Sequence, residues 1–137
     1  MKYFDDLFYN TIRDYCYANY PRIEVKQGAG LLNNNCHYNA VDFAEKENAY
    51  VILCLLFYTN NSDVVIHFIN KKYGIYIDNT LGVAGRTYEY RMIREVNLAE
   101  YEANNVDNIY SLLWNTKRFL NRQVNPVIRF LTKKKVV

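Results

Sequence analysis

Three residues, Cys36, His67 and Asp78, have the types and the order that nucleophilic chemistry on an acyl group needs. A cysteine thiolate attacks such a group when a histidine takes its proton and an acid orients the histidine. The segment 33–41 around Cys36 is typical of the start of a helix, where a thiolate is stabilised. His67 and Asp78 lie in two runs that predict neighbouring strands. We therefore expect a nucleophile, a general base and an orienting acid.

The predicted strands form one hairpin, which allows a geometric check. If Lys71–Gly74 is a four-residue loop, Asn70 opposes Ile75 and His67 opposes Asp78. Opposed residues have Cβ atoms about 4.5–5.5 Å apart, so the Nδ1–H of His67 could donate to the carboxylate. A three-residue loop would move Asp78 to the other face of the sheet. The predicted pair therefore depends on this register.

The oxyanion of an acyl intermediate needs two hydrogen-bond donors. The backbone N–H of Cys36 is one, and the side-chain amide of Gln27 or Asn35 is the expected second. The helix start and the imidazolium of His67 should lower the pKa of Cys36 below the ordinary value of about 8.5. His37 lies about 100° around the helix from its neighbour, so we expect it to line the cleft rather than act as the base.

Each of these residues also has a structural interpretation. Cys16 and Cys54 lie in apolar patterns and are expected to be core residues. His67 could be a hydrogen-bonded core histidine, and Asp78 could simply end a strand. The Cys and His spacings do not favour a metal site, because neither Cys-x-x-Cys nor His-x-x-x-His occurs.

Hydrophobic periodicity predicts the elements that would position these residues. We expect helices over 3–19, 35–48 and 106–123, and strands over 50–58, 64–70, 75–80 and 87–96. Loops or turns are expected at 22–35, 60–63, 71–74 and 81–86, and the last helix should end at Asn125-Pro126. Lys133–Lys135 should lie in a frayed tail. This order of elements predicts an α+β fold in one domain, residues 1–137.

Composition narrows the function classes. The chain has 137 residues, half of them hydrophobic, a formal net charge of +3, three cysteines and 14 tyrosines. This charge is too small to predict nucleic-acid binding. Acidic residues stand where a signal peptide would be apolar, and the longest apolar run, 50–58, is too short for a membrane span. We therefore expect a cytoplasmic protein without a membrane partner, in the host cytoplasm or virion if a phage encodes it.

Cys36, His67 and Asp78 together resemble the papain-like superfamily in its broad sense, which includes transglutaminase-like proteins and small bacterial or phage cysteine peptidases. The resemblance covers about residues 27–80. It implies a Cys-bearing helix packed on an antiparallel sheet that carries His and then Asp on adjacent strands. Gln27-Gly28 is similar to the papain segment that completes the oxyanion hole, although it lies farther from the cysteine here, and no Gly-Ser-Cys-Trp motif surrounds Cys36.

The predicted function is thiol-dependent chemistry on an amide or acyl bond, by a peptidase, an amidase or a transglutaminase-like transferase. No cofactor is required, because thiolate attack and an acyl-enzyme intermediate need none. The alternative is a catalytically idle interaction protein on the same scaffold, such as a phage virion component or host-takeover factor. Its partner, like the substrate of the enzyme, would be a protein or peptide. An exposed apolar patch away from Cys36 would favour this alternative.

Overall fold

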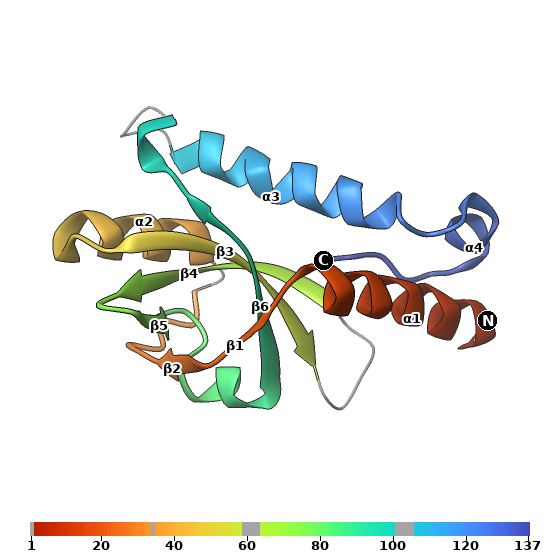
Figure 1. Ribbon diagram of the computed structural model, residues 1–137, viewed down its shortest axis with the longest axis horizontal. Helices are drawn as coiled ribbons and strands as arrows, with labels where there is room; N and C mark the ends of the chain where they lie inside the picture. Colours follow the sequence, from red (N-terminus) through yellow and green to blue (C-terminus); the bar gives the residue numbers. More distant parts are fainter. Residues whose placement is uncertain (1, 34, 59–63, 101–105) are drawn as a thin grey trace.

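The computed structural model describes residues 2–33, 35–58, 64–100 and 106–137 (Figure 1). Its helices are α1 (Lys2–Asn19), α2 (Cys36–Glu47), α3 (Val106–Asn121) and α4 (Pro126–Leu131), with short 3-10 helices η1 (Gly82–Thr87) and η2 (Leu98–Glu100). Its strands are β1 (Arg22–Ile23), β2 (Val25–Gln27), β3 (Tyr50–Tyr58), β4 (Val64–Lys72), β5 (Ile75–Asp78) and β6 (Tyr88–Val96).

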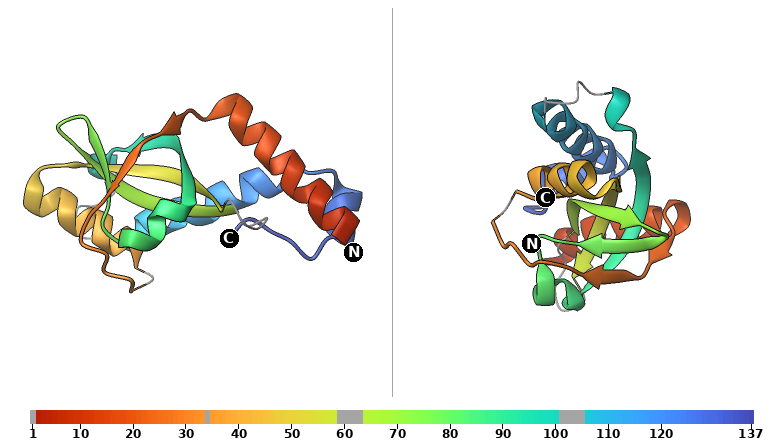
Figure 2. Two further views of the ribbon diagram at one scale, coloured as in Figure 1. Left: turned by 90° about the horizontal axis from the view of Figure 1, so that it is seen from below. Right: turned by 90° about the vertical axis from the view of Figure 1, so that its left-hand side faces the viewer.

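The six strands form one sheet in the order β1-β6-β3-β4-β5-β2. All neighbouring strands are antiparallel except β2 and β5, which run parallel. The helices α2 and α3 lie on the same side of the sheet, which curls around its other side (Figure 2). The molecule is therefore an α+β protein, as the order of elements predicts.

The central strand β3 is buried on both faces, as its continuous apolar run predicts. One face packs under the helices in a core that includes Leu53, Leu55 and Phe68. The other face packs inside the curl of the sheet with Ile52 and Tyr90. Burial on both sides makes β3 and its neighbours a rigid support for the side chains of β4.

The segments 22–35 and 125–131 differ from the expectations. The predicted loop 22–35 contains the edge strands β1 and β2, which are too short to show an alternating pattern. Pro126 does not simply end the preceding helix. It begins α4, whose N-cap residue Asn125 accepts a hydrogen bond from the Val127 N–H at 2.8 Å. Proline suits the first turn of a helix, because its missing N–H has no partner there.

The tail after α4 is also ordered, against the expectation that it frays. Val136 is buried in the core under the helices. Val137 donates its N–H to the Val64 carbonyl at 3.0 Å and accepts a hydrogen bond from the Ile66 N–H at 2.8 Å. The tail thus pairs with the free edge of β4, which compensates for the entropy lost on ordering it.

The β4–β5 hairpin has a tighter turn than the sequence predicts. The turn is Tyr73-Gly74, where φ is positive at both residues, as in the two-residue turns that suit hairpins. Asn70 consequently pairs with Ile77 and not with Ile75. This shift of two residues leaves every side chain on its expected face, because the side-chain period of a strand is two. Asp78 therefore still lies on the face of His67, but diagonally from it.

The expected turn at 60–63 lies outside the described residues. None of the described helices is both long and apolar enough to cross a membrane.

Candidate active site

Cys36 is the first residue of α2 and is partly buried. The segment before it is attached to the end of β5 by three backbone hydrogen bonds of 2.8–2.9 Å, from the N–H groups of Gly28, Leu31 and Leu32 to carbonyls of residues 78–80. These bonds connect the loop before Cys36 directly to the segment of Asp78. The position of Cys36 relative to Asp78 is therefore set by the backbone.

A close approach of two glycines makes this attachment possible. A Cβ atom at Gly82 would lie 2.7 Å from the Cα of Gly30, nearer than real Cβ contacts allow. Both residues have positive φ, which side chains disfavour. The loop before Cys36 can thus pack against the start of η1 only if both positions are glycine.

His67 lies on β4 and Asp78 at the end of β5, and both side chains are almost completely buried. His67 Nε2 lies 2.9 Å from Asp78 Oδ2. An ionised carboxylate only accepts hydrogen bonds, so the Nε2–H of the ring is the donor. The sequence analysis expected Nδ1 in this place. Because Nε2 binds Asp78, Nδ1 is the ring nitrogen left for the hydrogen bond with Cys36.

Asp78 is held by three further hydrogen bonds. The Tyr90 hydroxyl donates to Oδ2 at 2.6 Å, and the N–H groups of Thr80 and Leu81 donate to Oδ1 at 2.9 and 3.2 Å. Burial alone would raise the pKa of this carboxyl, but the hydrogen bonds from His67, Tyr90 and Thr80 and the imidazolium charge lower it. Asp78 is therefore a buried, fixed anion beside His67.

The electrostatics of Cys36 and His67 favour a thiolate–imidazolium pair. Burial disfavours the thiolate, but the hydrogen bonds from His37 and His67, the positive charge of His67 and the Phe68 backbone N–H outweigh it and lower the pKa of Cys36 to about 6. Burial also disfavours the imidazolium of His67, yet its contacts with Asp78 and Cys36 raise its pKa to about 9. Between these two values, both groups are charged at once.

Phe68 contributes its backbone because β4 has an open edge at this point. The strand β5 pairs with β4 only over Asn70–Lys72, and Cys36 lies where the edge becomes free. The Phe68 N–H can therefore donate to the sulfur instead of to a neighbouring strand. This donor belongs to the sheet and needs no further ordering.

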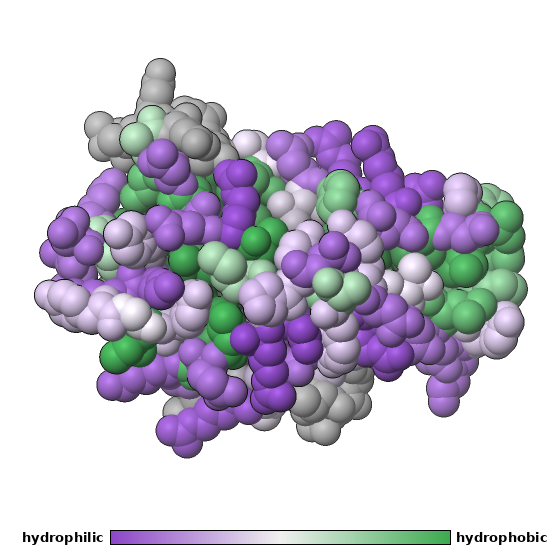
Figure 3. Space-filling view, in the orientation of Figure 1, coloured by the Kyte–Doolittle hydropathy of each residue, from purple (hydrophilic) through white to green (hydrophobic). Residues whose placement is uncertain are grey.

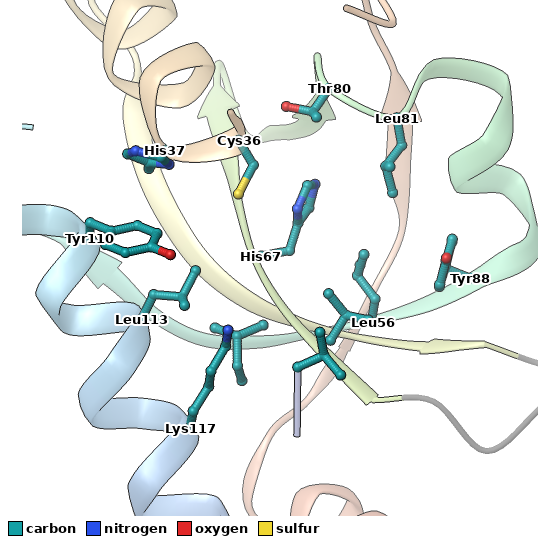
Figure 4. A pocket seen from close by; sticks show the side chains of 13 residues that line it. Cys36, His37, Leu56, His67, Thr80, Leu81, Tyr88, Tyr110, Leu113 and Lys117 are labelled. Atoms are coloured by element: carbon teal, nitrogen blue, oxygen red, sulfur yellow. The ribbon is translucent and has the colours of Figure 1, made fainter. Parts of the chain in front are cut away.

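The sulfur of Cys36 points into a cavity of about 300 Å³ (Figure 4). Its walls come from both sides of the sheet edge and from α3 and the tail: Cys36, His37, Leu56, Val65, Ile66, His67, Thr80, Leu81, Tyr88, Tyr110, Leu113, Lys117 and Val137. The site therefore brings a thiol, an imidazole and a space of ligand size together in one place.

The two expected oxyanion residues lie in different surroundings. Gln27 pairs with Asp78 across β2 and β5, and its Nε2 lies 3.4 Å from the Tyr90 hydroxyl. It lines another cavity, beside Gly85, and not the one at Cys36. The structure therefore places Gln27 behind Asp78 and away from the nucleophile, because β2 runs along the far edge of β5.

Asn35 precedes Cys36 as the N-cap residue of α2, but its side chain makes no capping hydrogen bond. Asparagine is favoured at the N-cap because its side chain can accept a hydrogen bond there, but Asn35 does not use its side chain in this way. Its backbone N–H instead binds the side chain of Asn33 at 3.1 Å. Without a side-chain cap, the first N–H groups of α2 remain donors for an anion. The oxyanion role of Asn35 stays a prediction.

The sequence analysis missed three residues of the site. Tyr90 had no signal of its own, because tyrosines are common in this chain and only the tertiary fold brings it to Asp78. Lys117 and Tyr110 share one face of α3 with the core residue Leu113, at spacings of three and four residues. This pattern could have identified them, had the neighbour of that face been known. His37 lines the cavity, as expected. It also hydrogen-bonds to Cys36, which the sequence did not predict.

The remaining cysteines are structural, as expected. Cys16 and Cys54 are fully buried. Burial raises the pKa of Cys16 to about 12 and that of Cys54 well above its ordinary value. Within the described part of the chain, no group of three or more His, Cys, Asp or Glu side chains is arranged to hold a metal ion.

Comparison with protein-family models, with curated proteins and with solved structures gives no match for this chain.

Proposed function

We propose that this protein is a thiol-dependent enzyme that hydrolyses or transfers the acyl group of an amide or related acyl bond. The observation that carries the proposal is the chain of contacts from Cys36 through His67 to Asp78 at the wall of a cavity. A papain-like arrangement of the core is part of the same proposal. It is supported by a cysteine that begins a helix and by a histidine and an aspartate on neighbouring antiparallel strands.

The proposed reaction uses each group at a defined atom. The thiolate of Cys36 attacks the carbonyl carbon and forms an S–C bond, and the carbonyl oxygen becomes an oxyanion beside the N–H groups that begin α2. The intermediate collapses with cleavage of the C–N bond, and the imidazolium of His67 protonates the departing amine. A water molecule or a second amine then gives a proton to His67 and attacks the thioester. This step releases the acyl product and restores the thiolate.

Asp78 keeps its negative charge throughout. It holds the Nε2–H of His67 and so keeps Nδ1 directed to the reacting atoms. The rate should rise with pH through about 6, as Cys36 ionises, and fall as His67 loses its proton near 9. The sign follows from the roles: attack needs the thiolate, and departure of the amine needs the imidazolium.

The test is acylation by p-nitrophenyl acetate, an activated ester that needs no specific recognition. We expect a burst of p-nitrophenolate equal to the protein concentration and an acetyl group on the peptide that contains Cys36, measured by mass spectrometry. Cys36→Ala should abolish both signals, whereas Cys54→Ala, the matched control, should retain them. Acetylation at residues other than Cys36, or a rate of Cys36 acetylation that is unchanged in His67→Ala, would contradict the proposal.

A second candidate, a protein-binding function, is favoured by one observation. Val127 and Phe130 of α4 are exposed by 63% and 87%. This helix lies at the right-hand end of the molecule in Figure 1, where Figure 3 shows an apolar surface. The enzymatic and the protein-binding functions can be distinguished in any assay of the protein's biological effect. Loss of the effect in Cys36→Ala supports the enzyme, and loss in Phe130→Ser with retention in Cys36→Ala supports the binding protein.

A further inference from the structure

Lys117 is a cation inside the candidate active site for which the proposed reaction has no use. It lies on α3, lines the same cavity as Cys36 and His67, and extends from the helix toward the space into which the sulfur points (Figure 4). Its ammonium group also lies 5.2 Å from the centre of the Trp114 ring on the same helix. This cation–π contact restricts the side chain without neutralising its charge.

No carboxylate side chain faces Lys117 across the described part of its cavity, which the Cys36 thiol and the chain-terminal Val137 also line. No Asp or Glu side chain lines the cavity among the residues that the structure describes, and none of the ion pairs found there includes Lys117. Burial lowers the pKa of Lys117, the thiolate of Cys36 raises it, and Lys135 on the tail lowers it further. The thiolate is thus an anion that acts on Lys117, but it is already paired with His67.

Apolar and aromatic side chains line much of the remaining wall, beside the polar groups of His37, His67 and Thr80. Tyr110, Leu113 and Leu56 surround the space between Lys117 and Cys36. A cation on one side of an apolar pocket fixes the orientation of a ligand that carries one negative group and an apolar stem. A single ammonium matches the single negative charge of a carboxylate, with which it forms a charge-assisted hydrogen bond.

We infer that Lys117 selects acyl substrates that carry a carboxylate near the bond to be cleaved, such as an acidic side chain. The inference rests on the proposed function, because it assigns the substrate class of the same site. Lys117 would pair with the carboxylate while Cys36 attacks the neighbouring carbonyl. It is therefore a specificity residue of the site and takes no part in bond cleavage.

The test compares two alkylating reagents with Cys36 in the full-length protein. Iodoacetate and iodoacetamide both lose iodide to the thiolate and form an S–CH2 bond, but only iodoacetate carries a carboxylate. We expect Lys117→Met to lower the ratio of the iodoacetate rate to the iodoacetamide rate by at least about threefold at low salt. Lys117→Arg should retain the ratio, because the positive charge remains.

Arg118→Met is the matched control, since Arg118 is an exposed cation on the same helix that binds Asn115 and does not line the cavity. It should leave the ratio unchanged. The ratio is insensitive to changes in the Cys36 pKa, because both reagents react with the same thiolate. An equal ratio in wild type and Lys117→Met would overturn the inference.

The iodoacetamide profile over pH separates this result from the proposed function. A midpoint near 6 with no effect of Lys117→Met on the ratio would overturn the carboxylate preference alone. An ordinary midpoint of about 8.5, with the ratio still dependent on Lys117, would overturn the activated thiolate and keep the carboxylate preference. Protection of Cys36 from iodoacetamide by glutarate in wild type, and its loss in Lys117→Met, would give further support.

Discussion

Cys36 and Cys54 are both neighbours of His67, yet their thiols have opposite properties. Cys54 faces His67 directly across β3 and β4, and burial together with the charge of Asp78 raises the pKa of its thiol well above the ordinary value. Cys36 approaches from the start of α2, at the open edge of β4, and has a pKa of about 6. Proximity to a histidine is therefore not enough by itself to lower the pKa of a thiol.

The difference lies in the donors that each sulfur meets. Cys36 receives hydrogen bonds from His37, His67 and the Phe68 backbone, at the positive end of a helix. Cys54 lies in an apolar layer with Ile52 and Leu56, where a thiolate would lose its hydration without compensation. A lowered thiol pKa in this protein thus requires a position at the edge of the sheet, where backbone N–H groups and a cavity are available together.

The largest expected effect is that of His67→Ala on Cys36. The mutation removes a hydrogen bond and a positive charge, so the midpoint of iodoacetamide labelling should rise from near 6 toward the ordinary thiol value. At pH 6.5, the labelling rate should fall by roughly a hundredfold, measured by peptide mass spectrometry. Cys54 should stay unlabelled in the folded protein in both forms. An unchanged midpoint would show that His67 does not act on Cys36.

Asp78→Asn should have the next largest effect. It removes the charge that supports the imidazolium, so the pKa of His67 should fall and the Cys36 midpoint should rise by about one pH unit. Because Asp78 is buried with four hydrogen-bond donors, the free energy of unfolding should fall by about 2–3 kcal/mol in urea denaturation. The control is Asp42→Asn on the exposed face of α2, which should change neither quantity measurably.

Tyr90→Phe should reduce stability more clearly than reactivity. The lost hydroxyl donates at 2.6 Å to Asp78 and does not touch Cys36, so we expect a loss of about 1–2 kcal/mol in the free energy of unfolding. The labelling midpoint should move by less than about half a pH unit. A shift as large as that of Asp78→Asn would mean that the carboxylate of Asp78 acts mainly through Tyr90 and not through His67.

Cys54→Ala should have the smallest effect on the site. It removes a buried sulfur from the apolar layer, which should cost about 1 kcal/mol of unfolding free energy in thermal or urea denaturation. The pH profile of Cys36 labelling should coincide with that of the wild type. Any displacement of that profile would show that the second cysteine takes part in the site.

Local patterns predicted most of the elements that hold the site. The strand 50–58 and the start of the helix at Cys36 agree with the structure within a residue, since an apolar run and the change to a helical period are local features. The strands β1 and β2, the helix α4 and the ordered tail were missed. Each is stabilised by partners far away in the chain, and no short window contains that information.

The residue types identified Cys36, His67 and Asp78 as the candidates, and the expected turn of even length predicted that His67 and Asp78 share a face. The prediction of a shared face holds although the predicted loop length is wrong. Strand side chains alternate with a period of two, so a shift of two residues leaves both side chains on the same face. Only the tertiary structure decided which nitrogen of His67 meets Asp78, that Gln27 lies behind it, and that Lys117 lines the cavity. These outcomes depend on the register of β5 and on the packing of α3, and both are set by contacts between distant segments.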